Sequence, residues 1–108
     1  FVKQAICSYA EDVGSLITDE RQVHEITETN IQGVKKHYGV TTEEGLMFFE
    51  VHKGADVVHR EECEKLLNEL TEVEQKKAET AALTTAKFMW NFLSGVSIKH
   101  GIPLKVAA

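Results

Sequence analysis

Three side chains that can bind a metal ion recur at helical spacing in the middle of the chain, namely His52, Asp56 and His59. Steps of four and three residues turn a helix by about +40° and −20° from the first position, so all three share one face. Two imidazoles and one carboxylate suit Fe(II) or Mn(II) better than they suit a structural zinc ion. The alternative is a solvated helix face on which these residues coincide by chance.

The surroundings of this triplet favour a metal site. The segment is largely apolar, with Phe48, Phe49, Val51, Ala55 and Val57 close by. We therefore expect part of the triplet to point inward, where ionisable groups need partners, and a metal ion is one such partner.

Length, charge and cysteine content bound the class of protein. The 108 residues allow one small domain at most. A net charge of −5 argues against nucleic acid and anionic membrane surfaces as partners. No apolar run approaches the roughly 20 residues of a membrane span. Cys7 and Cys63 make no disulfide framework, so we expect a cytoplasmic protein.

Apolar residues at a helical period, and a single proline near the end, predict an all-α chain of four or five helices. The expected helices cover residues 1–17, 18–38, 43–60, 60–70 and 71–100. The first either breaks near Gly14 or runs on into the second, which Thr18 or Asp19 would cap after a break. Cys63 is expected to be a small buried apolar residue rather than a ligand.

The expected ends of these helices carry recognisable capping residues. Gly39 and Gly101 stand where helices would stop. Thr41 or Thr42 would begin the central helix, with a capping box between Thr41 and Glu44. A second capping box, Thr71 with Glu74, would begin the last helix.

Four stretches together resemble the haem-oxygenase-like diiron oxidases of the TenA/PqqC-like superfamily, in the CADD-like branch. They are Glu20-x-Gln22-Val23 followed by Glu25, Lys35-Lys36-His37-Tyr38-Gly39-Val40, Glu44-Gly45-Leu46-x-Phe48-Phe49-x-Val51-His52, and Asp56-Val57-x-His59. The resemblance covers about Ala10 to Trp90. It implies a seven-helix bundle that holds two irons and uses O2 as a co-substrate.

The resemblance implies that Glu20, His52, Asp56 and His59 bind the metal, with no catalytic residue beyond these ligands. Carboxylates and imidazoles on facing helices are how helical bundles hold paired irons. The first half of the family's domain supplies a further glutamate and a histidine seven residues later, a spacing that this chain lacks. Residues 1–108 are therefore expected to form a single partial domain, the C-terminal half of a haem-oxygenase-like bundle.

Some positions depart from related branches. Members that make p-aminobenzoate carry a lysine ten residues after the first glutamate, where this chain has Asn30. His24 stands where the family often has proline. The cofactorless PqqC branch has Tyr and Arg in place of His52 and Asp56, and the TenA branch uses a cysteine nucleophile whose context neither Cys7 nor Cys63 matches.

The expected function is that of a non-haem iron-dependent oxidase or oxygenase. It would use a dinuclear iron site, with manganese as an alternative, and O2 on a small carboxylate or amino-acid-like substrate. Two alternatives remain open: a non-enzymatic helical module that dimerises, and a PqqC/TenA-like protein of cofactor biosynthesis. A half-domain would expose a large apolar surface, so we expect a homodimer.

Overall fold

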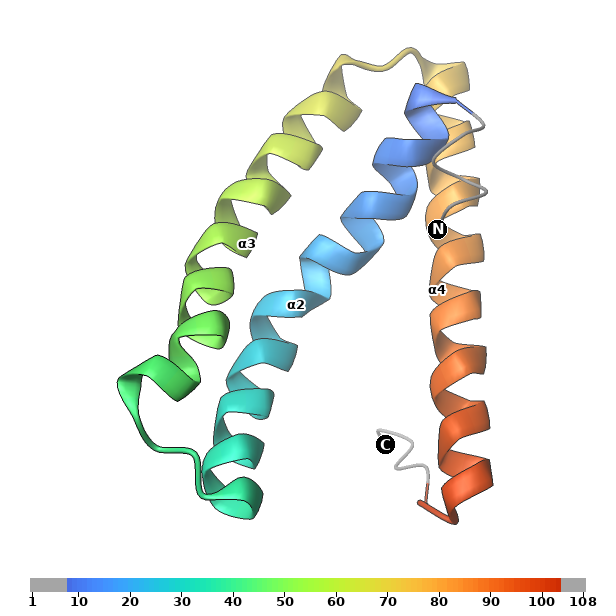
Figure 1. Ribbon diagram of the computed structural model, residues 1–108. Helices are drawn as coiled ribbons and strands as arrows, with labels where there is room; N and C mark the ends of the chain where they lie inside the picture. The colour runs from blue at the N-terminus through green and yellow to red at the C-terminus, as the bar shows by residue number, and fades with distance from the viewer. Residues whose placement is uncertain (1–7, 104–108) are drawn as a thin grey trace.

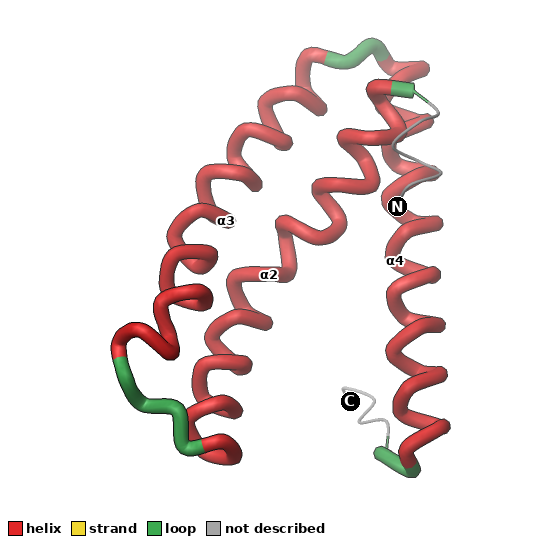
Figure 2. The backbone as a smooth tube through the Cα atoms, viewed as in Figure 1, coloured by secondary structure: helices red, strands yellow, loops and turns green. Residues whose placement is uncertain are grey.

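The computed structural model describes residues 8–103, which form three long helices joined by short connections (Figures 1 and 2). Helix α2 spans Tyr9–Tyr38, α3 spans Glu43–Glu69 and α4 spans Glu72–His100. No strand occurs within this range, so the all-α prediction is confirmed. The first part of the helix expected over residues 1–17, residues 1–7, lies outside the described residues. None of the helices in the described range is long and apolar enough to cross a bilayer.

Local sequence accounts for where these helices begin and end. The Ser8 hydroxyl accepts a hydrogen bond from the Glu11 backbone N–H at the start of α2. The predicted capping box of Thr71 and Glu74 opens α4 and is confirmed. Gly39 and Gly101 follow α2 and α4 with φ of 66° and 64°, a left-handed conformation that favours glycine, as predicted.

Several expected boundaries differ in the structure. Of the two alternatives at Gly14, the structure has the continuous helix: α2 runs on through Gly14, so Thr18 and Asp19 lie inside it and cap nothing. The separate helix expected over residues 60–70 is wrong, because α3 continues through this polar run with Cys63 buried on its inner side. The predicted capping box of Thr41 and Glu44 is also wrong, since Thr42 caps α3 by accepting from the Gly45 N–H at 3.1 Å.

Helix α2 lies between the other two helices and packs against both, whereas α3 and α4 barely touch (Figure 1). Its contact with α4 is close because Gly14 has no side chain: a Cβ there would lie 2.1 Å from the Ala78 carbonyl oxygen. One turn later, the Thr18 hydroxyl reaches the carbonyl oxygens of Gly14 at 3.1 Å and Ala82 at 3.2 Å. Small residues on both helices thus set the α2–α4 crossing.

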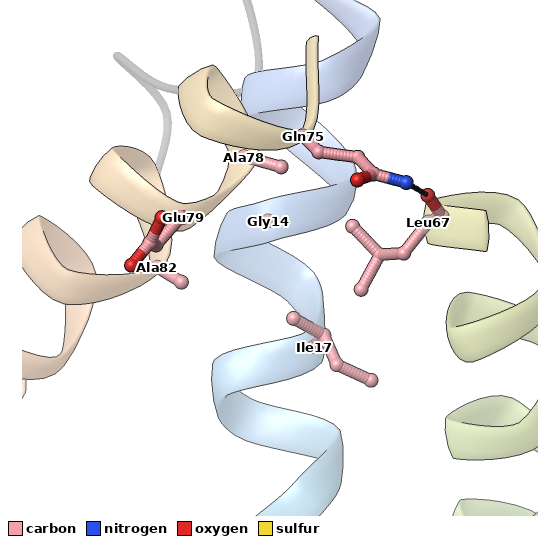
Figure 3. Close-up of a pocket in the computed structure, with 7 residues that line it drawn as sticks. All are labelled: Gly14, Ile17, Leu67, Gln75, Ala78, Glu79 and Ala82. Atoms are coloured by element: carbon pink, nitrogen blue, oxygen red, sulfur yellow. Dashed lines mark hydrogen bonds between the residues drawn. The ribbon is translucent and has the colours of Figure 1, made fainter. Parts of the chain in front are cut away.

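A small cavity of about 170 Å³ remains where the three helices meet (Figure 3). Gly14 and Ile17 of α2, Leu67 of α3 and Ala78 of α4 lie around it. At its edge, the Gln75 side-chain amide donates to the Leu67 carbonyl oxygen at 3.1 Å. This bond links the start of α4 to the end of α3.

Beyond this junction, α2 stays beside α3 but draws apart from α4 (Figure 1). The α2–α3 contact carries the inward residues Ile31, Leu46 and Asp56, all buried. The second half of α4 is different, because Phe88, Trp90 and Phe92 remain largely exposed. The core therefore extends along both faces of α2, and the predicted ligands are found on the side that faces α3.

Candidate metal centre

One carboxylate of α2 and two side chains of α3 converge across the buried α2–α3 contact. Glu20, Asp56 and His59 each place one potential ligand atom within 4.8 Å of the others. The three residues come from segments about 36 positions apart in the chain, and the packing of α2 on α3 brings them together. Three of the four predicted ligands therefore form one cluster.

The two carboxylates of this cluster are shielded and incompletely paired. The Asp56 side chain is buried, and its Oδ2 atom has no hydrogen-bond partner among the described residues. The same holds for Glu20 Oε2, which lies 3.6 Å from His59 Nδ1. A buried carboxylate oxygen that lacks a donor is costly, by about 1–3 kcal/mol or more for a charged group. A cation placed between these oxygens would relieve that cost.

His52 does not join the cluster. Its side chain is exposed, and its Nδ1–H group donates to the carbonyl oxygen of Phe48 one turn earlier, at 2.6 Å. Its ring also lies 4.1 Å from the Phe48 ring, centroid to centroid. The helix has the predicted register, but the residues of α3 that face the core at this point are Asp56 and Cys63. His52 therefore stands at the edge of the buried face and is satisfied by its own helix.

A cleft of about 340 Å³ opens beside Glu20 and His59. The remaining lining comes from Leu16, Glu62, Cys63 and Leu66, so the wall is mostly apolar with an acidic group at one point. Sequence reasoning did not single out Glu62 as a site residue, although it follows His59 by three positions and so shares its face. The cleft gives small molecules access to one side of the cluster.

The prediction that Cys63 is a small buried residue is confirmed, because Cys63 is only 4% exposed. Burial raises the pKa of its thiol above the ordinary value, and the negative charges of Glu20 and Glu62 add to this effect. A thiol of this kind stays protonated at neutral pH and is a poor metal ligand. The cluster therefore presents oxygen and nitrogen donors without a thiolate.

The donor set and its spacing fit a divalent cation. Two ligand atoms bound at about 2.1 Å to one metal are at most about 4.2 Å apart. The 4.8 Å spread of the cluster is close to this limit, so small side-chain rotations would bring all three atoms into coordination. Carboxylate and imidazole donors without sulfur favour iron or manganese over a structural zinc ion.

Two proteins named 4-aminobenzoate synthase are similar to this chain. The protein from Nitrosomonas europaea is 32% identical over 79 residues, which cover 71% of this chain and 32% of that protein. The protein from Chlamydia pneumoniae is 33% identical over 86 residues, which cover 79% of this chain and 38% of that protein. The chain is therefore similar to part of each of these two proteins. It spans about a third of the length of these curated relatives.

This similarity supports the resemblance drawn from the sequence at the level of the superfamily. No protein-family model matches the chain. No solved structure matches it either.

Proposed function

We propose that this chain supplies iron ligands to a non-haem oxidase or oxygenase that uses O2. Glu20, Asp56 and His59 would bind the metal directly, and His52 would complete the set after turning away from Phe48. The observation that supports this most strongly is the pair of carboxylate oxygens, Glu20 Oε2 and Asp56 Oδ2, that are buried without a hydrogen-bond partner and lie beside an imidazole.

The arrangement assigns each residue a part. Asp56 and Glu20 supply negative charge from opposite helices, so that binding of a cation also ties α2 to α3. The exposed imidazole of His59 reaches the cluster from the cleft side and leaves that side open to small molecules. When bound, iron would provide the redox chemistry for a reaction with O2.

The names of the relatives support a substrate class. 4-Aminobenzoate is a small aromatic carboxylate with an amine, which agrees with the carboxylate or amino-acid-like substrate expected from the sequence. We propose that this chain acts in the formation or conversion of such a compound. Asn30 stands where p-aminobenzoate-forming members carry lysine, so a reaction that depends on this lysine is not available to this chain.

A second candidate function is a helical module without catalytic activity of its own. The observation in its favour is that the described residues bring together three predicted ligands, while the chain spans about a third of its relatives. Under this proposal the cluster would be inherited from an ancestor and would bind iron weakly or not at all.

Anaerobic loading with Fe(II), followed by metal analysis per chain, separates the two candidates. We expect the wild-type chain to retain iron after desalting and the Asp56→Asn chain to lose at least about tenfold in affinity, because the substitution removes the buried anionic ligand. Glu61→Gln is the matched control, since Glu61 is an exposed carboxylate on the same helix. Iron retention that is the same in all three chains, or absent from the wild type, would contradict the metal assignment.

A further inference from the structure

Three carboxylates around the candidate metal centre are graded in their exposure to solvent. Asp56 is buried, the side chain of Glu20 is 14% exposed, and that of Glu62 is 58% exposed. The two inner carboxylates each have one buried oxygen without a hydrogen-bond partner among the described residues. A cation that reaches these oxygens has to lose most of its hydration water on the way, and this loss is costly unless other ligands replace the water.

The cleft beside the centre offers a route on which such ligands are available. Its lining combines three side chains that can bind a metal, Glu20, His59 and Glu62, with the apolar or protonated side chains of Leu16, Cys63 and Leu66. Glu62 follows His59 by three positions, so the two share one face of α3. Among the described residues that line the cleft, Glu62 is the one exposed carboxylate.

We propose that Glu62 is an entry ligand for the metal ion, which binds a divalent cation at the mouth of the cleft and passes it on to Glu20 and His59. Its carboxylate would replace hydration water early, before the ion reaches the inner oxygens of Glu20 and Asp56. This role rests on the metal centre proposed above. It adds a residue that acts on the rate of metal loading rather than on the final affinity.

The Glu62 carboxylate already binds a cationic group, the ammonium group of Lys65. Lys65 Nζ donates to Glu62 Oε1 at 2.6 Å, and both side chains are more than half exposed. A pair of this kind, three positions apart on a helix surface, is weak, so a divalent cation can displace the lysine. Lys65 should therefore compete with the entering metal ion and slow its binding.

The pKa of the Cys63 thiol agrees with a cleft in which two carboxylates act together. Burial raises this pKa, and the negative charges of Glu20 and then Glu62 raise it further. Both charges therefore act on the same residue of the lining. At about 0.15 M salt, charges beyond roughly 8 Å are largely screened in solution, so an ion in the cleft is attracted mainly by the carboxylates next to it.

The rate of Co(II) binding to the full 108-residue chain tests this role. It is measured by stopped flow with a metallochromic dye that reports free Co(II), and the dissociation constant is measured by titration. We expect Glu62→Gln to slow association by roughly fivefold to tenfold and to leave the dissociation constant within about twofold of the wild type. Dissociation should slow by the same factor as association, because the ion enters and leaves by the same route.

Glu61→Gln is the matched control for this variant. It removes the same charge from an exposed neighbour that does not line the cleft, so it should change the association rate by less than about twofold. Lys65→Gln should have the opposite effect and speed association by about twofold, because the competing ammonium group is gone. Lys36→Gln, at an exposed lysine near the end of α2, should leave the rate unchanged.

Three results would contradict the entry role, and they differ in what else they overturn. Equal association rates in Glu62→Gln and Glu61→Gln would show that only the overall charge matters. A dissociation constant that rises about tenfold or more in Glu62→Gln would make Glu62 a permanent ligand instead. Failure of the wild-type chain to bind Co(II) would overturn the metal centre itself, and the entry role with it.

Discussion

At the scale of single residues, the two histidines of α3 differ in the contacts that their side chains make. His59 lies beside the buried Glu20 oxygen, whereas His52 points outward and bonds to its own helix. To bind a metal at this centre, His52 would have to give up the hydrogen bond to Phe48 and the contact with the Phe48 ring. Such a hydrogen bond contributes about 1 kcal/mol. The two histidines should therefore contribute unequally to metal affinity.

This difference gives a prediction for His52→Ala and His59→Ala, measured by titration with Co(II) as an air-stable probe. We expect His59→Ala to weaken binding by roughly 100-fold, as for the loss of a direct ligand, and His52→Ala to weaken it by about tenfold or less. His37→Ala, an exposed histidine near the end of α2, serves as the control. Binding that is unchanged in His52→Ala would remove His52 from the ligand set.

The sequence could predict this part of the site only up to a point. Helical spacing placed Asp56 and His59 on one face, because i, i+3 neighbours share a face in any helix, and in the structure both belong to the cluster. The partner from α2, Glu20, depended on the resemblance to a family, because spacing within one helix carries no information about the helix packed against it. The rotation of His52 away from the cluster depends on a side-chain hydrogen bond, which spacing also leaves undetermined.

At the scale of helices, the crossing of α2 and α4 depends on one residue without a side chain. A methyl group at Gly14 would overlap the Ala78 carbonyl, and backbone atoms of a packed helix cannot move aside cheaply. From the sequence, the same glycine left two alternatives open, a break in the helix or a helix that runs on. Its low helix propensity is real, but close packing against α4 outweighs it.

Gly14→Ala and Gly33→Ala form a matched pair that tests this explanation by urea unfolding, followed by circular dichroism. We expect Gly14→Ala to lower the free energy of unfolding by roughly 1–3 kcal/mol, because α2 and α4 must separate. Gly33 lies in the same helix with nothing within 4 Å of an added Cβ, so Gly33→Ala should raise it by about 0.5–1 kcal/mol. Two changes of the same sign would contradict the close α2–α4 contact.

Helix ends were easier to predict than helix interruptions. The stops at Gly39 and Gly101 and the capping box at Thr71 follow from a few neighbouring residues. The continuity of α3 through its polar run does not, because an exposed helix face and a loop can share the same composition. Cys63 distinguishes the helix from a loop, because its burial shows that one side of this polar run faces the core.

At the scale of the whole molecule, the candidate centre joins α2 and α3, which pack against each other across a buried contact. Without a cation, Asp56 and Glu20 place two carboxylates close together in a shielded position, which opposes folding. With a cation bound only by the folded state, the same residues would stabilise the chain by mass action. The metal and the fold are therefore expected to be thermodynamically coupled.

This coupling predicts a reversal of stability between the wild-type chain and Asp56→Asn, measured as Tm at one fixed protein concentration. In chelator, we expect Asp56→Asn to melt at a higher temperature, because it removes a buried charge beside Glu20. With Mn(II) or Co(II) at about 100 times the dissociation constant, the wild type should gain about 2.7 kcal/mol, which corresponds to a Tm increase of roughly 10 °C or more. Asp56→Asn should gain little.

The control for this experiment is Glu61→Gln, whose carboxylate is exposed on α3 and which should follow the wild type in both conditions. If Tm rises equally with metal in all three chains, the ion binds elsewhere, since only Asp56→Asn alters the buried cluster. If Asp56→Asn melts below the wild type in chelator, the Asp56 carboxylate stabilises the chain without a metal. Its burial would then be structural, and the case for a metal centre between α2 and α3 would fail.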